Sequence, residues 1–137
     1  MTIREFNNLG EIQKYYDEKS NTYIFKENDD LIDLVIFNFN LNVKANINVG
    51  NIDAWNINAE DINAINIDAW NISARDIDAG NITAMNINAQ DISYYAVCFA
   101  YQNIKCKSIK GIRKNAKHFV LNGELEVEEN EKQGSIK

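Results

Sequence analysis

Residues 51–70 read NIDAWNINAEDINAINIDAW, and this stretch decides the fold of the chain. Isoleucine returns at every fifth position, alanine follows each isoleucine two places later, and Asn or Asp precedes it. A period of five fits neither an amphipathic helix nor a coiled-coil heptad. The isoleucines of the series are Ile52, Ile57, Ile62, Ile67, Ile72, Ile77, Ile82, Ile87 and Ile92, and the alanines run from Ala54 to Ala89.

The spacing within each unit predicts an extended chain that bends at regular intervals. Residues two apart on an extended chain point the same way, so isoleucine and alanine face one side while Asn, Asp and the middle residue face the other. One unit alone cannot bury its isoleucine, but stacked coils can, and short internal repeats are typical of solenoids. The sequence therefore predicts an all-β protein, a parallel β-solenoid (β-helix) with five-residue sides.

The pattern resembles the pentapeptide-repeat family of right-handed β-helices over residues 46–112. The resemblance rests on the five-residue period and on Asn or Asp before a branched aliphatic residue. In that family the small residue precedes the large one by two positions, whereas here alanine follows isoleucine. The resemblance implies four-sided coils of twenty residues. It also implies a functional precedent, since some members are similar to duplex DNA in shape and charge and inhibit DNA gyrase.

When the repeat is divided into rows of fifteen residues, the similarity of the rows favours three-sided coils of fifteen residues instead. Residues 51–65 match residues 66–80 at eleven of fifteen positions, but match residues 71–85 at only seven. A recent duplication without structural meaning also explains this match, and a four-sided coil would stack Trp55, Arg75 and Tyr95 in a cation–π column. The three-sided columns are Trp55, Trp70 and Met85; Glu60, Arg75 and Gln90; Asn51, Asn66 and Asn81; Asn56, Asn71 and Asn86; and Asp61, Asp76 and Asp91.

Both ends of the repeat carry predicted caps. Residues 1–45 are assigned to an N-terminal cap and first coil, with a short helix over residues 8–18 whose N-cap is Asn8. Its predicted buried stripe is Phe6, Leu9, Ile12 and Tyr16, and a strand and turn follow over residues 22–30. Apolar residues then alternate from Phe37 to Val49, leading into the solenoid of residues 46–112.

The repeat is interrupted near its C-terminal end. Residues 96–102, AVCFAYQ, have two residues more than a unit, which predicts a bulge at a corner, and the core places then resume at Ile104, Cys106, Ile109 and Gly111. Asn-Gly between alternating apolar residues predicts a hairpin over residues 118–127. Residues 113–137 are therefore assigned to a C-terminal cap and tail, of which residues 130–137 are predicted to be frayed.

Composition and charge limit the classes of function. The chain has 137 residues, 45% of them hydrophobic, and a net charge of −6, which suits one folded domain and disfavours direct binding to nucleic acid or to an anionic membrane. The start has no apolar signal region and no stretch is long enough to span a membrane, so the cytoplasm is the expected compartment. Six bases without an acid form a basic collar at Lys105, Lys107, Lys110, Arg113, Lys114 and Lys117.

Catalysis finds little support in the residues, and we predict no catalytic residue, cofactor or metal. There is no Gly-rich phosphate loop and no nucleophile elbow, and the single histidine, His118, is interpreted as structural. Cys106 occupies an alanine place and is predicted to lie in the core, while Cys98 lies in the bulge, where lysines could activate it. The column of Asp61, Asp76 and Asp91 could bind Ca²⁺, but Ca²⁺ needs about six to eight converging oxygens, so solvated carboxylates are the preferred interpretation.

The predicted function is a non-enzymatic protein-interaction module whose acidic surface imitates nucleic acid and inhibits a nucleic-acid-handling enzyme. By analogy, a phage-encoded blocker of host defence would fit this description. Trp55 and Trp70 are predicted to face outward, as contacts for a protein or a sugar, or to pack at the corners. The alternatives are an assembly module that forms homodimers through its caps, and a sugar-binding face. The predicted partner-binding carboxylates are Asp53, Glu60, Asp61, Asp68, Asp76, Asp78 and Asp91.

Overall fold

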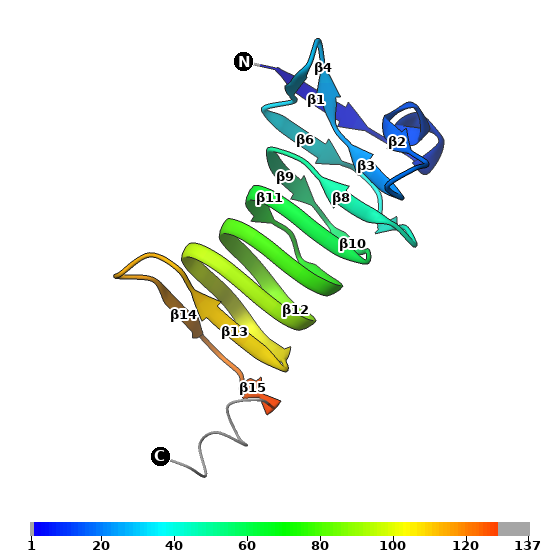
Figure 1. The fold of residues 1–137 in the computed structure, drawn as a ribbon. Coiled ribbons are helices and arrows are strands. Elements are labelled where there is room, and N and C mark those ends of the chain that lie inside the picture. Colours follow the sequence, from blue (N-terminus) through cyan, green and yellow to red (C-terminus); the bar gives the residue numbers. More distant parts are fainter. Residues whose placement is uncertain (1, 129–137) are drawn as a thin grey trace.

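A computed structural model describes residues 2–128 as a parallel β-solenoid, with coils stacked from β1 at one end to β15 at the other (Figure 1). The strand β12 is 36 residues long because it continues around successive corners. The elements are β1 (Ile3–Phe6), the 3-10 helix η1 (Leu9–Tyr15), β2 (Tyr16–Asp17), β3 (Thr22–Ile24), β4 (Lys26–Glu27), β5 (Asp30–Leu31), β6 (Leu34–Phe37), β7 (Leu41–Asn42), β8 (Asn46–Asn48), β9 (Asn51–Ala54), β10 (Asn56–Asn58), β11 (Asp61–Asp68), β12 (Asn71–Cys106), β13 (Ser108–Gly111), β14 (Lys117–Val120) and β15 (Leu125–Val127).

Each regular coil has fifteen residues and three sides. Strand β10 pairs in parallel with β12 so that Ile57 lies beside Ile72, and β11 pairs with β12 so that Ile62 lies beside Ile77. Each partner is fifteen positions further along the chain. The three-sided prediction is thus confirmed, and the twenty-residue coil implied by the family resemblance is wrong for this chain.

The isoleucine and alanine columns fill the interior of the coils. All nine isoleucines of the repeat are at most 2% exposed, and the alanines that follow them are buried except for Ala74, which is partly buried. Burying one such aliphatic side chain contributes about 1.5–3 kcal/mol to stability. Among residues 2–128 no polar or charged residue is buried, so the interior is uniformly apolar.

Asparagine side chains form two ladders along the outside of the coils. In the first ladder Asn66 donates to Asn51 at 2.7 Å and Asn81 donates to Asn66 at 2.8 Å. The second ladder repeats the contact over Asn56, Asn71 and Asn86, at 2.7 and 2.9 Å. Each side-chain amide donates a hydrogen bond to the coil before it and accepts one from the coil after it. Stacked asparagines therefore pair their own donors and acceptors, and these bonds hold the coils in register.

The N-terminal cap contains the predicted helix, but in 3-10 form. The Asn8 side chain accepts a hydrogen bond from the Glu11 backbone N–H at 3.2 Å, as the capping prediction required. A 3-10 helix has about three residues per turn, so Ile12 and Tyr15 share its buried face. The predicted burial of Leu9 and Tyr16 is wrong: both are exposed.

The chain between the helix and the repeat follows its predicted pattern. Strands β4 and β5 pair antiparallel around a turn in which Asn28 and Asp29 have positive φ angles of 52° and 68°, a conformation that Asn and Asp tolerate. The alternating apolar residues from Phe37 to Val49 face the core, where all are buried except the half-buried Phe39.

The two inserted residues of 96–102 lie at two corners, one at each. Strand β13 pairs with β12 seventeen residues apart, with Ile92 beside Ile109. Cys98 and Ala100 are fully buried, so Ile92 and Cys98 are six positions apart, as are Cys98 and Ile104, where the repeat has five. Cys98 therefore occupies an isoleucine place in the core, although it belongs to the segment that is predicted to bulge.

The predicted C-terminal hairpin does not form. Strands β14 and β15 each pair in parallel with β12, with Phe99 beside Phe119 and Cys106 beside Val127, so the solenoid continues through them. The Asn-Gly pair makes a corner: a Cβ atom at Gly123 would lie 1.6 Å from the Gln102 carbonyl oxygen, so only glycine fits. The tail predicted for residues 130–137 lies outside the described residues.

No helix within residues 2–128 has the length and apolar character needed to cross a membrane.

Candidate functional site

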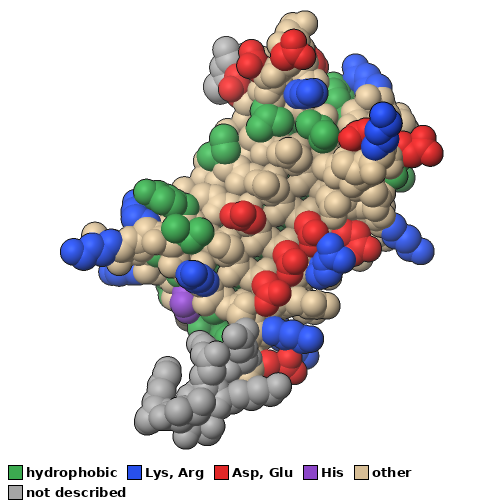
Figure 2. Space-filling model, viewed as in Figure 1, with side chains coloured by type: hydrophobic (Ala, Val, Ile, Leu, Met, Phe, Trp, Pro, Cys, Tyr) green, Lys and Arg blue, Asp and Glu red, His purple; other side chains and the backbone are tan. Residues whose placement is uncertain are grey.

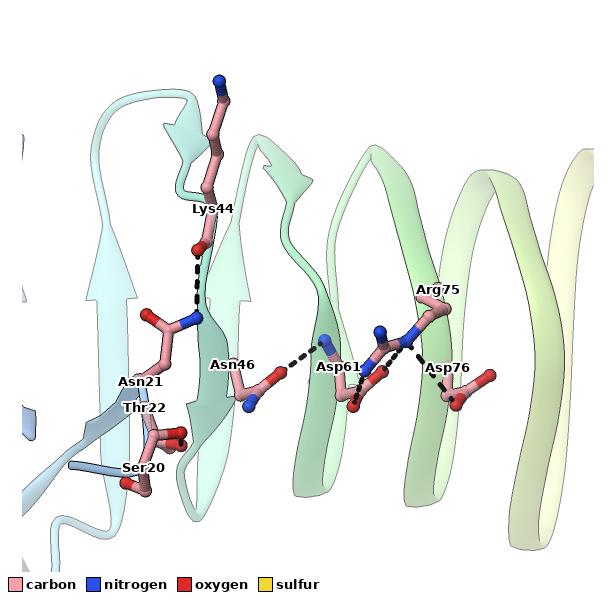
Figure 3. A network of polar contacts seen from close by, with 8 residues as sticks. All are labelled: Ser20, Asn21, Thr22, Lys44, Asn46, Asp61, Arg75 and Asp76. Atoms are coloured by element: carbon pink, nitrogen blue, oxygen red, sulfur yellow. Dashed lines mark hydrogen bonds and ion pairs between the residues drawn. The ribbon is translucent and has the colours of Figure 1, made fainter. Parts of the chain in front are cut away.

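Three carboxylates stack in register near one corner of the solenoid. Asp61 pairs with Asp76 in the parallel ladder, and Asp91 follows one coil later beside Ser108. Coils repeat at about 4.8 Å, so neighbouring carboxylates repel each other unless a partner compensates. We call Asp61, Asp76 and Asp91 the carboxylate column; Figure 3 shows Asp61 and Asp76 with the side chain of Arg75 between them.

The two ends of the carboxylate column have hydrogen-bond partners, but its middle does not. Arg75 binds Asp61 through two nitrogens, at 3.0 and 2.6 Å, whereas its Nε is 4.0 Å from the nearer oxygen of Asp76. The Ser108 hydroxyl donates to Asp91 at 2.6 Å. The Oδ1 atom of Asp76 is inaccessible and accepts no hydrogen bond. Burial raises the pKa of Asp76 above its ordinary value, and the charges of Asp61 and Asp91 raise it further.

Replacing Asp76 with asparagine should stabilise the protein at neutral pH. A raised pKa in the folded state means that folding disfavours the ionised form of Asp76. The protein is therefore more stable when Asp76 is protonated at acid pH, and it loses this stability as the pH rises and Asp76 ionises. An amide at this position would also repeat the residue type of Asn46, which precedes Asp61 in the same column, in the manner of the asparagine ladders. We expect a gain of about 0.2–1 kcal/mol, or roughly 1–4 °C in Tm at about pH 7, that shrinks toward about pH 3.

Asp78→Asn is the matched control for this measurement. Asp78 is exposed and pairs with Asn63, so no carboxylate lies below it. The Tm of both variants is measured from about pH 3 to about pH 7. The comparison separates repulsion within the carboxylate column from the general effect of removing one negative charge. An Asp76→Asn variant with the Tm of Asp78→Asn at every pH would contradict the interpretation.

Two of the remaining predicted partner-binding carboxylates, Asp53 and Asp68, lie apart from the carboxylate column, whereas Glu60 and Asp78 are its neighbours. Asp53 pairs with Asp68, and Asp68 with Thr83, on another side of the coil. Asp78 stands beside Asn63, and Glu60 lies at the corner, where its carbonyl accepts from the Arg75 N–H at 2.7 Å. The seven carboxylates therefore divide between surfaces. In Figure 2 acidic side chains form an oblique row across the middle coils, with basic side chains beside it.

The two tryptophans stack on each other at a different corner. The ring centroids of Trp55 and Trp70 are 6.2 Å apart and the rings are inclined by only 18°. Their side chains are 50% and 59% exposed, which confirms that they face outward. The backbone N–H of Trp70 donates to the carbonyl of Trp55, and that of Met85 to the carbonyl of Trp70, so the three residues form the predicted apolar column.

The cysteines and the histidine have structural surroundings. Burial, and next the neighbouring Cys106, raise the pKa of Cys98 to about 12, and burial raises that of Cys106 to about 11. The suggested activation of Cys98 by lysines is therefore wrong, while the core position of Cys106 is confirmed. Burial lowers the pKa of His118, whose Nδ1 lies 2.6 Å from the Tyr94 hydroxyl. His118 and the buried Tyr94 therefore share one hydrogen bond.

Three residues of the basic collar, Arg113, Lys114 and Lys117, line a hollow of about 650 Å³ together with Phe119. Within residues 2–128 no three side chains of His, Cys, Asp or Glu are arranged to hold a metal ion.

Neither a protein-family model nor a curated protein nor a solved structure matches the chain. The fold and surface define the class, a repeat β-solenoid with an apolar interior whose charged side chains lie on the exterior.

Proposed function

We propose that this chain is a non-enzymatic interaction module of the pentapeptide-repeat type that imitates nucleic acid. Its carboxylate column would occupy the phosphate-binding site of a protein that handles DNA or RNA. The observation that carries the proposal is the in-register stack of Asp61, Asp76 and Asp91, which has one arginine, Arg75, as its cationic partner.

The spacing of the charges supports this proposal. One strand of B-DNA carries a phosphate about every 3.4 Å along the axis, and the solenoid carries a carboxylate about every 4.8 Å. Three carboxylates therefore form a short charged row that is comparable to a row of phosphates but more widely spaced. The ladder hydrogen bonds of each coil hold them in place, so little conformational entropy is lost when a cationic surface binds them.

The chemistry of the partner follows from the same argument. A surface of lysines and arginines built for phosphates would also bind an ordered carboxylate row, and salt would weaken that contact. By analogy, a small inhibitor of a nucleic-acid enzyme, such as a phage-encoded blocker of host defence, would act in this way. The direct partner is then a protein, without nucleic acid or membrane in the contact.

A competition assay tests the proposal. A labelled DNA or RNA duplex is bound to each member of a panel that contains DNA gyrase, an RNA polymerase and several nucleases, and the solenoid is added as competitor. We expect displacement from at least one enzyme, with an inhibition constant that rises steeply with salt. The triple variant Asp61→Asn, Asp76→Asn, Asp91→Asn should inhibit at least about tenfold more weakly, a loss of about 1.4 kcal/mol.

The double variant Asp53→Asn, Asp68→Asn is the control, because it removes carboxylates from another side of the coil. It should inhibit as the natural sequence does. Both variants should fold, since the asparagine ladders already stack amides in successive coils. The proposal fails if no enzyme in the panel releases its duplex, or if both variants lose inhibition equally.

A further inference from the structure

The tryptophan corner continues beyond Met85 to a third aromatic residue, Tyr101. The amide of Asn86 reaches Gln102 Oε1 at 3.2 Å, which places Tyr101 in the coil next to Met85. The order along the corner is therefore Trp55, Trp70, Met85 and Tyr101. The spacing of the repeat alone does not predict this neighbour, because Tyr101 follows the first inserted residue.

Met85 leaves a slot between the aromatic rings on either side of it. A groove of about 340 Å³ has Trp70, Met85 and Tyr101 in its lining, together with Asp68 and Thr83. The backbones of Trp70 and Tyr101 are two coils apart, which is about 10 Å, and the Tyr101 ring packs edge-to-face against Phe99. One flat group with van der Waals contact to a ring on each side needs about 7–8 Å. The slot therefore has room for a single planar group above the flexible Met85 side chain.

The charge at the slot is negative and is not compensated. Asp68 lines the groove, and Asp53 stacks against Asp68 in the preceding coil. Burial and the charge of Asp53 raise the pKa of Asp68. Over residues 2–128 neither carboxylate forms an ion pair, whereas Asp61 has Arg75. A ligand that brings a positive charge would relieve this repulsion.

We propose that this slot binds the guanidinium group of an arginine side chain on a partner protein. Guanidinium is planar, stacks on aromatic faces and forms paired hydrogen bonds with a carboxylate. Trp70 and Tyr101 supply the walls, Met85 the floor, and Asp68 the countercharge. Lysine lacks the plane, and a neutral sugar or base would leave the two carboxylates unpaired. This inference does not depend on the carboxylate column, which lies at a different corner.

Titration with three short peptides tests the specificity of the slot. The probes are glycine-flanked peptides that carry one arginine, one lysine or one citrulline, the last being planar but uncharged. Tryptophan fluorescence and NMR shifts report binding. We expect saturable binding of the arginine peptide at least about tenfold tighter than of the other two, a difference of about 1.4 kcal/mol. Equal binding of all three, or tighter binding of a glucan oligosaccharide or a mononucleotide, overturns the proposal.

Met85→Trp is the sharpest variant for this proposal. It repeats the residue of the two preceding coils, so the coil accommodates it, and the third ring fills the slot. Arginine binding should fall at least about tenfold in Met85→Trp and in Asp68→Asn, but remain unchanged in Asp78→Asn. A folded Met85→Trp variant that binds the arginine peptide normally overturns the assignment. The same variant should still displace nucleic acid in the competition assay, so the two proposals can fail separately.

Discussion

Ile72→Asp should unfold the solenoid. Ile72 is 2% exposed and lies against Ile57 of the preceding coil. The substitution removes an aliphatic side chain worth about 2–5 kcal/mol and puts a carboxylate where no residue can pair with it. The combined cost approaches or exceeds the whole stability of an ordinary domain, about 5–15 kcal/mol. Circular dichroism should show loss of the strand signal at room temperature, and NMR shifts should lose their dispersion.

Ser73→Asp is the matched control, since it adds the same group one residue later. Ser73 is exposed and pairs with Asn58 on the outside of the coil. We expect its Tm to stay close to that of the natural sequence, because surface changes usually alter stability by less than about 0.5 kcal/mol. If Ile72→Asp and Ser73→Asp melt alike, the isoleucines do not line the interior.

Tyr94→Ala should cost about 3–5 kcal/mol, although it restores the alanine that the repeat would place there. Tyr94 is 1% exposed, and Gly111 lies beside it in the next coil. A Cβ atom at Gly111 would be 2.8 Å from the Tyr94 hydroxyl oxygen, so the ring fills the space that the glycine leaves. Removing the ring leaves a cavity beneath β13. We expect Tm to fall by roughly 10 °C in a thermal melt.

Two further variants separate packing from hydrogen bonding at this position. Tyr94→Phe loses the bond to His118 Nδ1 and should cost only about 1 kcal/mol. Gly111→Ala alone should destabilise, because its Cβ would lie 2.5 Å from the Ala116 Cβ and 2.8 Å from the Tyr94 hydroxyl oxygen. Added to Tyr94→Ala it should recover little of the lost stability, because the clash with Ala116 remains. A Tyr94→Ala variant that melts like the natural sequence would show that the ring is not part of the packing.

The terminal coils mark the limit of what the sequence predicts. The hairpin signal of Asn122-Gly123 is strong locally, but pairing with β12 satisfies more backbone groups than pairing of two short strands with each other. The spacing of an α-helix predicts that Tyr16 is buried, whereas the three-residue turn of the 3-10 helix buries Tyr15 instead. At Asn122-Gly123 a tertiary contact outweighs a local preference, and at the helix a different helix type changes which residues share a face.

The sequence also predicts some contacts of the candidate site and not others. The stacking of Trp55 on Trp70 and of Asp61 on Asp76 follows from the match between rows of fifteen residues. The binding of Arg75 to Asp61, which leaves Asp76 without a hydrogen bond on one oxygen, does not follow from it. The slot between Trp70 and Tyr101 also does not follow from the match between rows, because the insertions change the register between these two residues.

The sequence by itself determined the lumen of the solenoid and the residues that face it, and it favoured the coil of fifteen residues over one of twenty. It can do so because every coil repeats the environment of its neighbour, so a local pattern of five residues specifies contacts that are distant along the chain. Only the tertiary structure decided how the end coils close, where Cys98 and Tyr94 lie, and which carboxylates have partners. These features depend on contacts between residues that the repeat does not relate to one another.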